Sequence, residues 1–398
     1  MFQSLIRTSL IVALALVAGG FPCSPAQAAP LLGLERVSYE MPPRTVLLDR
    51  TLWADKTALV EGIEASLGYL RTEGAKKSYE RFNSPEITLE HVEKSLERLR
   101  ELLLESSSPD DLDQAIRNEF AVFRAKGFDG RGTVRFTGYF QPSYEAKRTR
   151  TDEYRYPIYY LPPHFPLWNK PHPTRVELEG PQGLGGPQTL LYGSELAWLK
   201  NRFDVFMIHL QGSAVLEFEG EEPVAIGFAA GTEHPFKGIS ASILKKYGVP
   251  WNKLDVFFGS HPEIFDEIIS RNNRFIFFTE NPHGTPLSSL GLPVTPGRSI
   301  ATDKLRFPPG AVGLIKANLP EFSPSGRIHH EKSFRFVLDH DSGSAIKGAG
   351  RVDLYMGSGP QAQRLANNLY GLGQLYYLLL KDAPKMQTSQ SDAIKHRG

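Results

Sequence analysis

The chain has 398 residues, more than one hydrophobic core usually supports, so two domains are expected. Its formal net charge is +1, from 45 Lys and Arg against 44 Asp and Glu, which argues against a nucleic-acid-binding protein with its clustered basic excess. With 41% hydrophobic and 22% charged residues the chain should fold, and its 36 Gly and 30 Pro favour a turn-rich β protein over a helical bundle.

The N-terminus has the pattern of an export signal. Arg7 precedes a short apolar run at 10–18, and Ala26-Gln27-Ala28 follows as a small-residue cleavage site, so residues 1–28 are predicted to be a signal peptide. The single cysteine, Cys23, lacks the small residues that precede a lipidated cysteine, so the mature chain is expected to be unlipidated and free of disulfides. No later stretch approaches the ~20 apolar residues of a membrane span, which excludes a multi-pass protein. The predicted location is the periplasm or cell envelope, with outer-membrane association left open.

Apolar residues at helical spacing predict a helical region after this segment. Helices are expected over 53–71 and 88–105. A third begins at the N-cap Ser108 with Pro109 in its first turn and is expected to extend to Phe123.

The remainder of the chain is predicted to be β-rich. Alternation predicts a strand at 133–137 and an edge strand at 154–159, and apolar runs predict two buried strands, 205–210 and 274–278. Other segments are assigned by composition: a Gly- and Pro-rich loop at 161–190, a helical insert at roughly 238–272, and a polar, disordered tail from 387.

Most catalytic motifs are absent from the sequence. The eleven His show no metal-ligand spacing, His329-His330 fits a surface loop, and there is no nucleophile elbow or phosphate loop. Gly183 to Gly186 lacks the strand–helix context of a dinucleotide site. We therefore expect no metal and no cofactor, and carboxylate chemistry remains.

The densest group of polar residues lies at 337–357, where two short strands bracket a Gly-rich turn. In the second strand, alternation places Arg351, Asp353 and Tyr355 on the face opposite the core. Asp339 and Asp341 end the preceding strand, so a carboxylate cluster is expected, in which one pKa is raised because like charges cannot all ionise. A protonated carboxyl is the general acid that glycosidic cleavage needs. From the residues alone, a structural Arg351–Asp353 ion pair is an equally good interpretation.

Five short motifs occur in an order that resembles the family of membrane-bound lytic murein transglycosylase A. They span about 130–380 and comprise Phe136 to Pro142, Tyr156 to Tyr159, Leu210 to Ser213, Leu292 to Asp303, and Asp341 to Gly357. The resemblance implies a mainly β fold with helices at the N-terminal end. A double-psi β-barrel domain (29–141 and 274–385) would carry an inserted second β-barrel-like domain (142–273), with a groove between them and a tail at 386–398. The family pattern is broken by Ala214 and Ser344, where the family has Gly.

The resemblance also implies a lyase reaction on the glycan strands of peptidoglycan. Asp353 matches the family's catalytic aspartate, acting as general acid and then base to give 1,6-anhydromuramyl ends, and Asp341 matches the aspartate that opens the turn. Residues expected to contact the sugar or its acidic groups are Thr137, Gly138, Tyr139, Gln211, Gly212, Ser213, Lys347 and Arg351. Lys347 and Arg351 could also hold Asp341 charged, and Arg298 with Asp303 fits either a groove wall or an ion pair. A monomer is expected, with no nucleic-acid partner.

Two other classes stay open at this stage. An expansin-like protein would bind glycan without cleaving it. An inverting glycoside hydrolase would need a second carboxylate about 6.5–9.5 Å from the acid to activate water.

Overall fold

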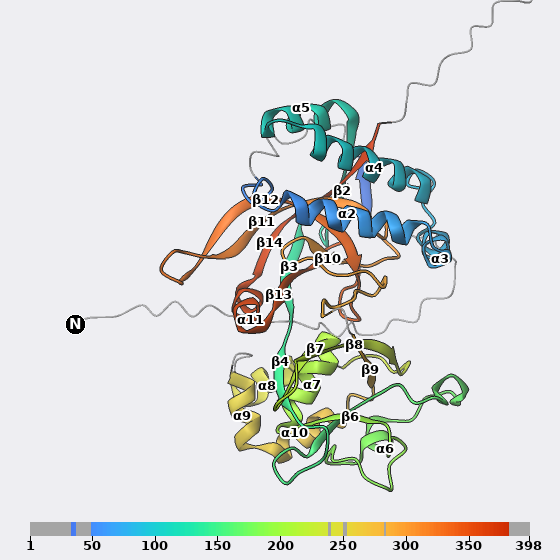
Figure 1. Cartoon of the computed structure of the whole chain (residues 1–398), viewed down its shortest axis with the longest axis vertical. Coiled ribbons are helices and arrows are strands. Elements are labelled where there is room, and N and C mark those ends of the chain that lie inside the picture. Colours follow the sequence, from blue (N-terminus) through green and yellow to red (C-terminus); the bar gives the residue numbers. More distant parts are fainter. Residues whose placement is uncertain (1–32, 37–48, 238–239, 250–252, 282–283, 382–398) are drawn as a thin grey trace, which may run out of the picture.

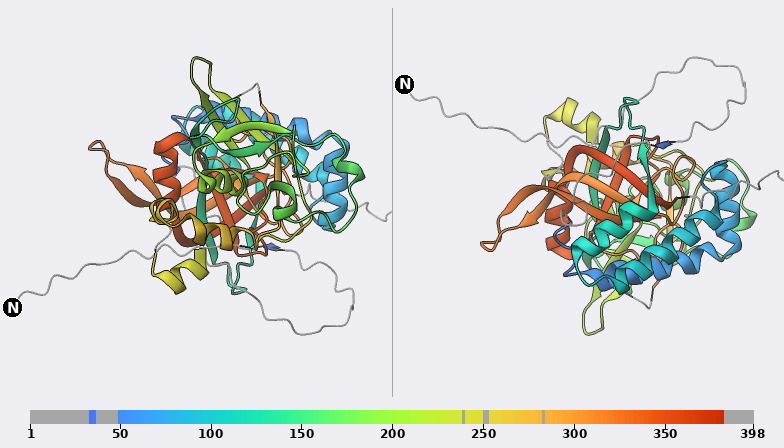
Figure 2. Two further views of the ribbon diagram at one scale, coloured as in Figure 1. Left: turned by 90° about the horizontal axis from the view of Figure 1, so that it is seen from below. Right: turned by 90° about the horizontal axis from the view of Figure 1, so that it is seen from above.

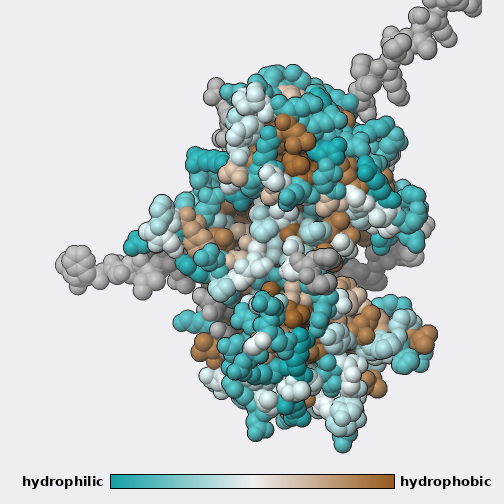
Figure 3. Space-filling model, viewed as in Figure 1, coloured by the Kyte–Doolittle hydropathy of each residue, from teal (hydrophilic) through white to brown (hydrophobic). Residues whose placement is uncertain are grey.

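The computed structural model describes residues 33–36, 49–237, 240–249, 253–281 and 284–381. Figure 1 shows two lobes, with the N-terminal helices and most long strands in the upper one and the middle of the chain in the lower one. The space-filling view shows a largely hydrophilic face whose outline narrows between the lobes (Figure 3). The predicted signal peptide (1–28), Cys23 and the predicted tail (386–398) lie outside the described residues.

Four helices cover one end of the upper lobe (Figure 2, right). They are α2 (Lys56–Leu70), α3 (Glu73–Phe82), α4 (Leu89–Glu105) and α5 (Pro109–Glu119). Their apolar stripes are buried, as the spacing predicted: Leu59 and Ile63 of α2 and Leu96 of α4 join the barrel's hydrophobic core. Thr88 and Ser108 accept the backbone N–H groups of His91 and Asp111, which caps α4 and α5.

A closed barrel of six strands forms the body of the upper lobe. Its members are β3 (Val134–Gln141), β10 (Ser299–Ala301), β11 (Val312–Phe322), β12 (Ile328–Asp341), β13 (Arg351–Ser358) and β14 (Tyr370–Leu380). The order is β14-β11-β12-β10-β13-β3, and a β3–β14 pairing closes the ring. Strands β1 (Leu34–Arg36) and β2 (Phe120–Ala125) extend the sheet beyond β14, and α11 (Gly359–Asn368) packs on β3 and β13.

The lower lobe has a smaller β framework. A four-stranded sheet runs β4 (Ser143–Ala146), β7 (Ser213–Phe218), β8 (Val224–Gly231) and β9 (Ile276–Glu280), and β5 (Tyr156–Tyr159) pairs with β6 (Glu195–Leu199). Two isolated bridges join the β5–β6 pair to both edges of the four-stranded sheet, which gives a barrel-like ring. They are Lys147 with Trp198 and Tyr160 with Phe278. The helices of this lobe are α6 (Arg175–Glu179), α7 (Arg202–Gln211), α8 (Ser240–Tyr247), α9 (Leu254–Ser260) and α10 (Pro262–Ile269), with a 3-10 turn at Phe165–Leu167.

The mainly β fold with N-terminal helices is confirmed, as are the strands at 133–137 and 274–278 and the helical insert. The double-psi crossing and the domain boundaries at 142 and 273 stay predictions.

The strand expected at 205–210 is wrong, because this segment lies in helix α7. Residues 205–209 are all buried, so α7 has no polar stripe to reveal its helical period. A short apolar run cannot be assigned by periodicity alone.

Two other expectations are corrected. Helix α5 ends at Glu119, and Phe120 begins β2, whose residues pair with β14 from Phe120↔Leu380 to Arg124↔Tyr376. Tertiary pairing therefore overrides the helical spacing there. The loop expected at 161–190 contains α6, which starts with a capping box between Thr174 and Glu177.

Candidate active site

Asp353 lies on β13 directly opposite Thr137 of the parallel neighbour β3. The Thr137 hydroxyl donates a hydrogen bond of 2.5 Å to Asp353 Oδ1. Desolvation raises the pKa of the Asp353 carboxyl and the nearby Asp341 charge adds to this, while Arg351 and the Thr137 hydrogen bond oppose it. Asp353 is only partly shielded from solvent, so it combines an acid-favouring environment with access to a ligand.

The alternative of a structural Arg351–Asp353 ion pair is not what the geometry shows. Among the ion pairs of the described residues, none joins Arg351 to a carboxylate within 4.0 Å, and Arg351 Nε is buried without a hydrogen-bond partner. Arg351 therefore influences Asp353 only electrostatically, by lowering the pKa of its carboxyl group without direct contact.

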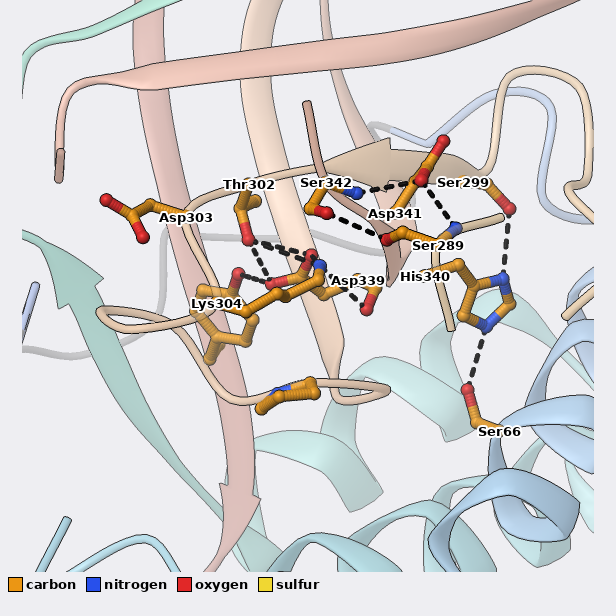
Figure 4. A network of polar contacts seen from close by, with 12 residues as sticks. Ser66, Ser289, Ser299, Thr302, Asp303, Lys304, Asp339, His340, Asp341 and Ser342 are labelled. Atoms are coloured by element: carbon orange, nitrogen blue, oxygen red, sulfur yellow. Dashed lines mark hydrogen bonds and ion pairs between the residues drawn. The ribbon is translucent and has the colours of Figure 1, made fainter. Parts of the chain in front are cut away.

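Asp341, the last residue of β12, is held by three donors. The backbone N–H groups of Ser289 and Ser342 each donate to Oδ1 at 2.8 Å, and the Tyr139 hydroxyl donates to Oδ2 at 3.0 Å. Figure 4 shows Asp341 beside Ser289 and Ser342, which are also joined through their hydroxyls at 2.9 Å. Three hydrogen-bond donors therefore fix the position of this carboxyl group.

The two aspartates flank one small residue. Ala301 of β10 pairs with Asp341 on β12 and with Asp353 on β13. Two strand spacings separate the Cα atoms of the aspartates by about 10 Å. The barrel edge thus presents a fixed carboxylate and a desolvated carboxyl on either side of Ala301.

Asp339 does not join this pair, which corrects the expected three-carboxylate cluster. It is fully buried, forms an ion pair with Lys304, and accepts hydrogen bonds from the hydroxyls of Thr302 and Tyr377. The β10–β12 register shifts here: the three residues of β10 from Ser299 to Ala301 oppose the four residues of β12 from Leu338 to Asp341. This irregularity breaks the alternation, so residues 339 and 341 have different partners (Figure 4).

Tyr139 and Gly138 continue β3 beside Thr137. The Tyr139 ring packs on Tyr355, the residue opposite it on β13, with ring centroids 5.2 Å apart. A Cβ at Gly138 would lie 2.7 Å from the backbone of Ala366, so this glycine lets α11 approach the barrel. The structure thus gives Gly138 a packing role, while Thr137 and Tyr139 hold the aspartates.

The predicted contact residues Gln211, Gly212 and Ser213 lie in the lower lobe, at the junction of α7 and β7. Gly212 has φ +77° and its N–H bonds to the carbonyl of Ile208, so it forms the left-handed C-cap of α7. Gln211 is half-buried and Ser213 is buried. Whether these side chains touch a sugar stays a prediction.

The Gly-rich turn after β12 is fixed by Asp303. Asp303 Oδ2 accepts the backbone N–H of Gly348 at 2.8 Å and Oδ1 that of Leu305 at 3.2 Å. Lys347 is exposed, and no ion pair among the described residues includes it. The expected Lys347–Asp341 contact is therefore absent, and backbone donors take its place.

Arg298 is not a groove residue. It is fully buried and forms ion pairs with Asp49 and Asp55. Next to it, Ser299 bonds to Nδ1 of His340, whose Nε2 bonds to Ser66 of α2 (Figure 4). Burial lowers the pKa of His340 to about 3, so it stays neutral. These contacts attach the helices to the strand that carries Asp341.

One group of possible metal ligands occurs within the described residues. Glu321, His329 and Glu331 place three ligand atoms within 4.8 Å of one another on the β11–β12 hairpin. His329 therefore belongs to a strand rather than to the expected loop. Both carboxylates are ion-paired, Glu321 with Arg335 and Glu331 with Arg50, and none of these residues contacts Asp341 or Asp353.

Sequence reasoning missed Ser289 and Ala301. Ser289 contributes a backbone N–H from an irregular segment, and any residue type offers that donor. Ala301 matters by its position between two strands, which only the sheet order reveals.

Comparisons with known proteins agree with this architecture. The family described as the MltA specific insert domain matches residues 135–279, and the family described as the 3D domain matches residues 298–379. Membrane-bound lytic murein transglycosylase A of Vibrio cholerae serotype O1 is 29% identical over 297 residues, which cover 72% of this chain and 76% of that protein. The protein of the same name from Escherichia coli K12 is 28% identical over 270 residues, 66% of this chain and 70% of its own length.

Two solved structures have a similar fold. A membrane-bound lytic murein transglycosylase from Agrobacterium tumefaciens superposes with a TM-score of 0.66 at 24% identity, covering 87% of this chain and 98% of that one. The Escherichia coli protein with bound chitohexaose gives a TM-score of 0.63 at 21% identity, covering 89% and 96%.

Proposed function

Because the chain belongs to the membrane-bound lytic murein transglycosylase A family, we propose that it cleaves the MurNAc-GlcNAc β-1,4 bond of peptidoglycan without water. The observation that carries the proposal is the contrast between two aspartates on either side of Ala301. Asp353 is desolvated with one hydroxyl donor, whereas Asp341 accepts three hydrogen bonds. One is suited to carry a proton and the other a charge.

In the first step, protonated Asp353 gives its proton to the glycosidic oxygen. Thr137 donates to Oδ1, so Oδ2 is the oxygen that can carry this proton. As the C1–O bond breaks, positive charge develops on the muramyl ring, and the fixed carboxylate of Asp341 stabilises it. The leaving sugar departs with its new hydroxyl.

In the second step, the Asp353 carboxylate accepts the proton of the C6 hydroxyl of the same muramyl residue. The C6 oxygen then bonds to C1 and closes a 1,6-anhydro ring. Because this nucleophile belongs to the substrate, its effective concentration is high and no water has to be activated. Asp353 regains its proton, so one residue serves both steps and the enzyme returns to its starting form.

Asp341 is a poor candidate for the water-activating base of an inverting hydrolase. Both of its oxygens already accept hydrogen bonds, from Ser289 and Ser342 on Oδ1 and from Tyr139 on Oδ2. This supports the lyase over the hydrolase.

The binding of chitohexaose by the Escherichia coli protein supports a glycan strand as ligand, because that oligosaccharide has the same β-1,4 GlcNAc backbone chemistry. We propose that the glycan strand binds between the two lobes and that the protein acts as a monomer. We also propose that it is exported and works in the cell envelope. Among the described residues, no helix is both long and apolar enough to cross a membrane.

Product analysis tests the proposal. Purified full-length protein is incubated with isolated sacculi, and the released fragments are measured by mass spectrometry, with the Asp353→Asn variant as control. Anhydro ends, lighter than reducing ends by one water, are expected only with the wild type. Reducing ends would establish a hydrolase, and folded protein that binds sacculi without releasing fragments would establish an expansin-like binder.

A further inference from the structure

A small hollow lies where the Gly-rich turn of the barrel meets the lower lobe. Its lining includes Ser344 of the turn together with Leu210, Phe236, Asn272 and Arg274 of the lower lobe. Ser344 follows Asp341 by three residues, and Leu210 directly precedes the Gln211-Gly212-Ser213 motif. The two segments that sequence analysis singled out for substrate contact therefore converge on this hollow.

Arg274 is the charged group that distinguishes this hollow. Its side chain is half-buried, and Nη1 donates a hydrogen bond to the carbonyl of Thr232 at 3.3 Å. No ion pair among the described residues includes Arg274, and desolvation alone lowers its pKa. A partly desolvated guanidinium without a carboxylate is unfavourable unless a ligand supplies the negative charge.

The other buried arginines of this lobe show the contrast. Arg175 pairs with Glu179, and Arg202 pairs with both Glu179 and Asp266. Arg175 also lines the hollow, but its charge is already neutralised. Arg274 thus offers the fork of donors that suits a carboxylate.

A second unpartnered donor lines the same hollow. His209 is buried, and its Nδ1 accepts the backbone N–H of Ile276 at 3.3 Å, which places the ring proton on Nε2. Nε2 has no hydrogen-bond partner among the described residues. Arg274 and His209 thus bring an unpaired guanidinium and an unpartnered ring N–H to the lining of this hollow, and no carboxylate residue lines it.

From this geometry we propose that Arg274 binds a carboxylate of the peptidoglycan strand and so selects acidic glycans over neutral ones. The inference rests on the proposed function and adds the chemical group that is recognised. The carboxylate has two sources in peptidoglycan: the amino acids of the peptide stem, or the lactyl group of a muramyl residue whose stem has been removed. Chitohexaose has neither.

Equilibrium binding tests the inference apart from catalysis. Full-length Asp353→Asn protein, alone and with Arg274→Gln, is titrated with three probes: soluble strands with intact stems, strands stripped of stems by an amidase, and chitohexaose. Arg274→Gln should weaken binding to acidic strands by about tenfold and leave chitohexaose binding unchanged. Loss confined to intact strands identifies the stem carboxylates as the ligand, and loss confined to stripped strands identifies the lactyl carboxylate.

Two further variants control for folding and for general charge. Arg271→Gln removes an exposed arginine three residues away that pairs with Glu267 at the surface, and it should bind all probes as the parent does. Arg274→Lys keeps the positive charge but lacks the paired N–H donors of the guanidinium, so it should restore part of the affinity. It also provides a second variant to measure if Arg274→Gln is unstable.

The outcomes separate the inference from the proposed function. Equal weakening for all three probes, or no weakening for either acidic strand, would overturn the role of Arg274 while leaving the lyase intact. If the parent protein binds none of the strands, the proposed function fails and the inference fails with it.

Discussion

Asp339 and Asp353 occupy neighbouring regions of the barrel and have opposite surroundings. Asp339 is fully buried, forms an ion pair with Lys304 and accepts two hydroxyls, so its charge is satisfied within the protein. Asp353 is partly exposed, has one hydroxyl donor and has no ion-pair partner among the described residues. An aspartate therefore contributes to stability where the protein supplies its counter-charge, as at Asp339. Where the protein supplies none, as at Asp353, the carboxyl group stays available for chemistry.

Asp353→Asn should have the largest effect on activity. An amide cannot give or take a proton, so turnover on sacculi should fall by at least about 10²–10⁴-fold, the range typical of general acid–base catalysis. Stability should not fall. The raised pKa means that the native state binds the proton more tightly than the unfolded state, so the folded protein loses stability as pH rises through that pKa. At neutral pH the amide removes this penalty.

The measurement compares turnover with the melting temperature of the same sample. A stable variant that keeps more than about a tenth of wild-type turnover would contradict the catalytic role, given the size of the effect expected. A lowered melting temperature with activity kept would instead indicate a structural aspartate.

Asp339→Asn should have the converse effect, a loss of stability without loss of chemistry. It leaves the Lys304 ammonium without its counter-charge, which typically destabilises a fold by about 3–5 kcal/mol. Denaturant unfolding measures this loss, and turnover per folded molecule should stay near the wild-type value. Adding Lys304→Met should recover part of the stability, because it removes the orphaned charge. A well-folded but inactive Asp339→Asn protein would refute the division between the two aspartates.

Thr137→Val should have a smaller effect, with a signature in the pH profile. Its hydroxyl contributes about 1–1.5 kcal/mol, so turnover should fall by no more than about tenfold. Turnover requires protonated Asp353 and is lost as pH rises through its pKa. Because the Thr137 hydrogen bond lowers that pKa, its removal should move the alkaline limb to higher pH. Thr279→Val, at an exposed position on β9, should leave the limb in place, and an unmoved limb in Thr137→Val would show that Thr137 has no influence on the acid.

Chelation should have no effect on turnover. The proposed steps use only carboxyl and hydroxyl groups, and the Glu321, His329 and Glu331 group is not in contact with the aspartates. Activity on sacculi is measured before and after EDTA treatment. Loss of turnover that zinc or magnesium restores would require a metal in the reaction.

The sequence predicted much of the barrel edge, because its short strands alternate strictly. Alternation placed Val352, Leu354 and Met356 in the core and Asp353 on the site face, whereas Tyr355, also predicted for the site face, is buried. Thr137 and Tyr139 were predicted as site residues from the family resemblance. What could not be predicted was which strands are neighbours. Thr137 and Asp353 are 216 residues apart, and their parallel pairing follows from closure of the whole barrel. Likewise, the irregularity that separates Asp339 from Asp341 depends on the third strand, β10.

The lower lobe was harder to predict for another reason. Residues 205–209 of helix α7 are all buried, so hydrophobicity gave no period from which to distinguish the segment from a strand. Arg274 was predicted as the first residue of a strand but precedes β9, and nothing in the sequence shows that it lacks a carboxylate partner. Showing that Arg274 has no carboxylate partner requires the positions of all neighbouring Asp and Glu side chains.

The register shift between β10 and β12 makes the length of this segment as important as its chemistry. Removing one residue between Leu338 and Asp341 would restore a regular ladder and exchange inward and outward positions, so that the carboxylate beside Ser289 would turn toward Lys304. The protein would keep every residue type of its site and lose the site. Homologues and engineered variants of this barrel are therefore expected to tolerate substitutions in this segment far better than single-residue insertions or deletions. Neither composition nor motif content reveals this constraint on segment length.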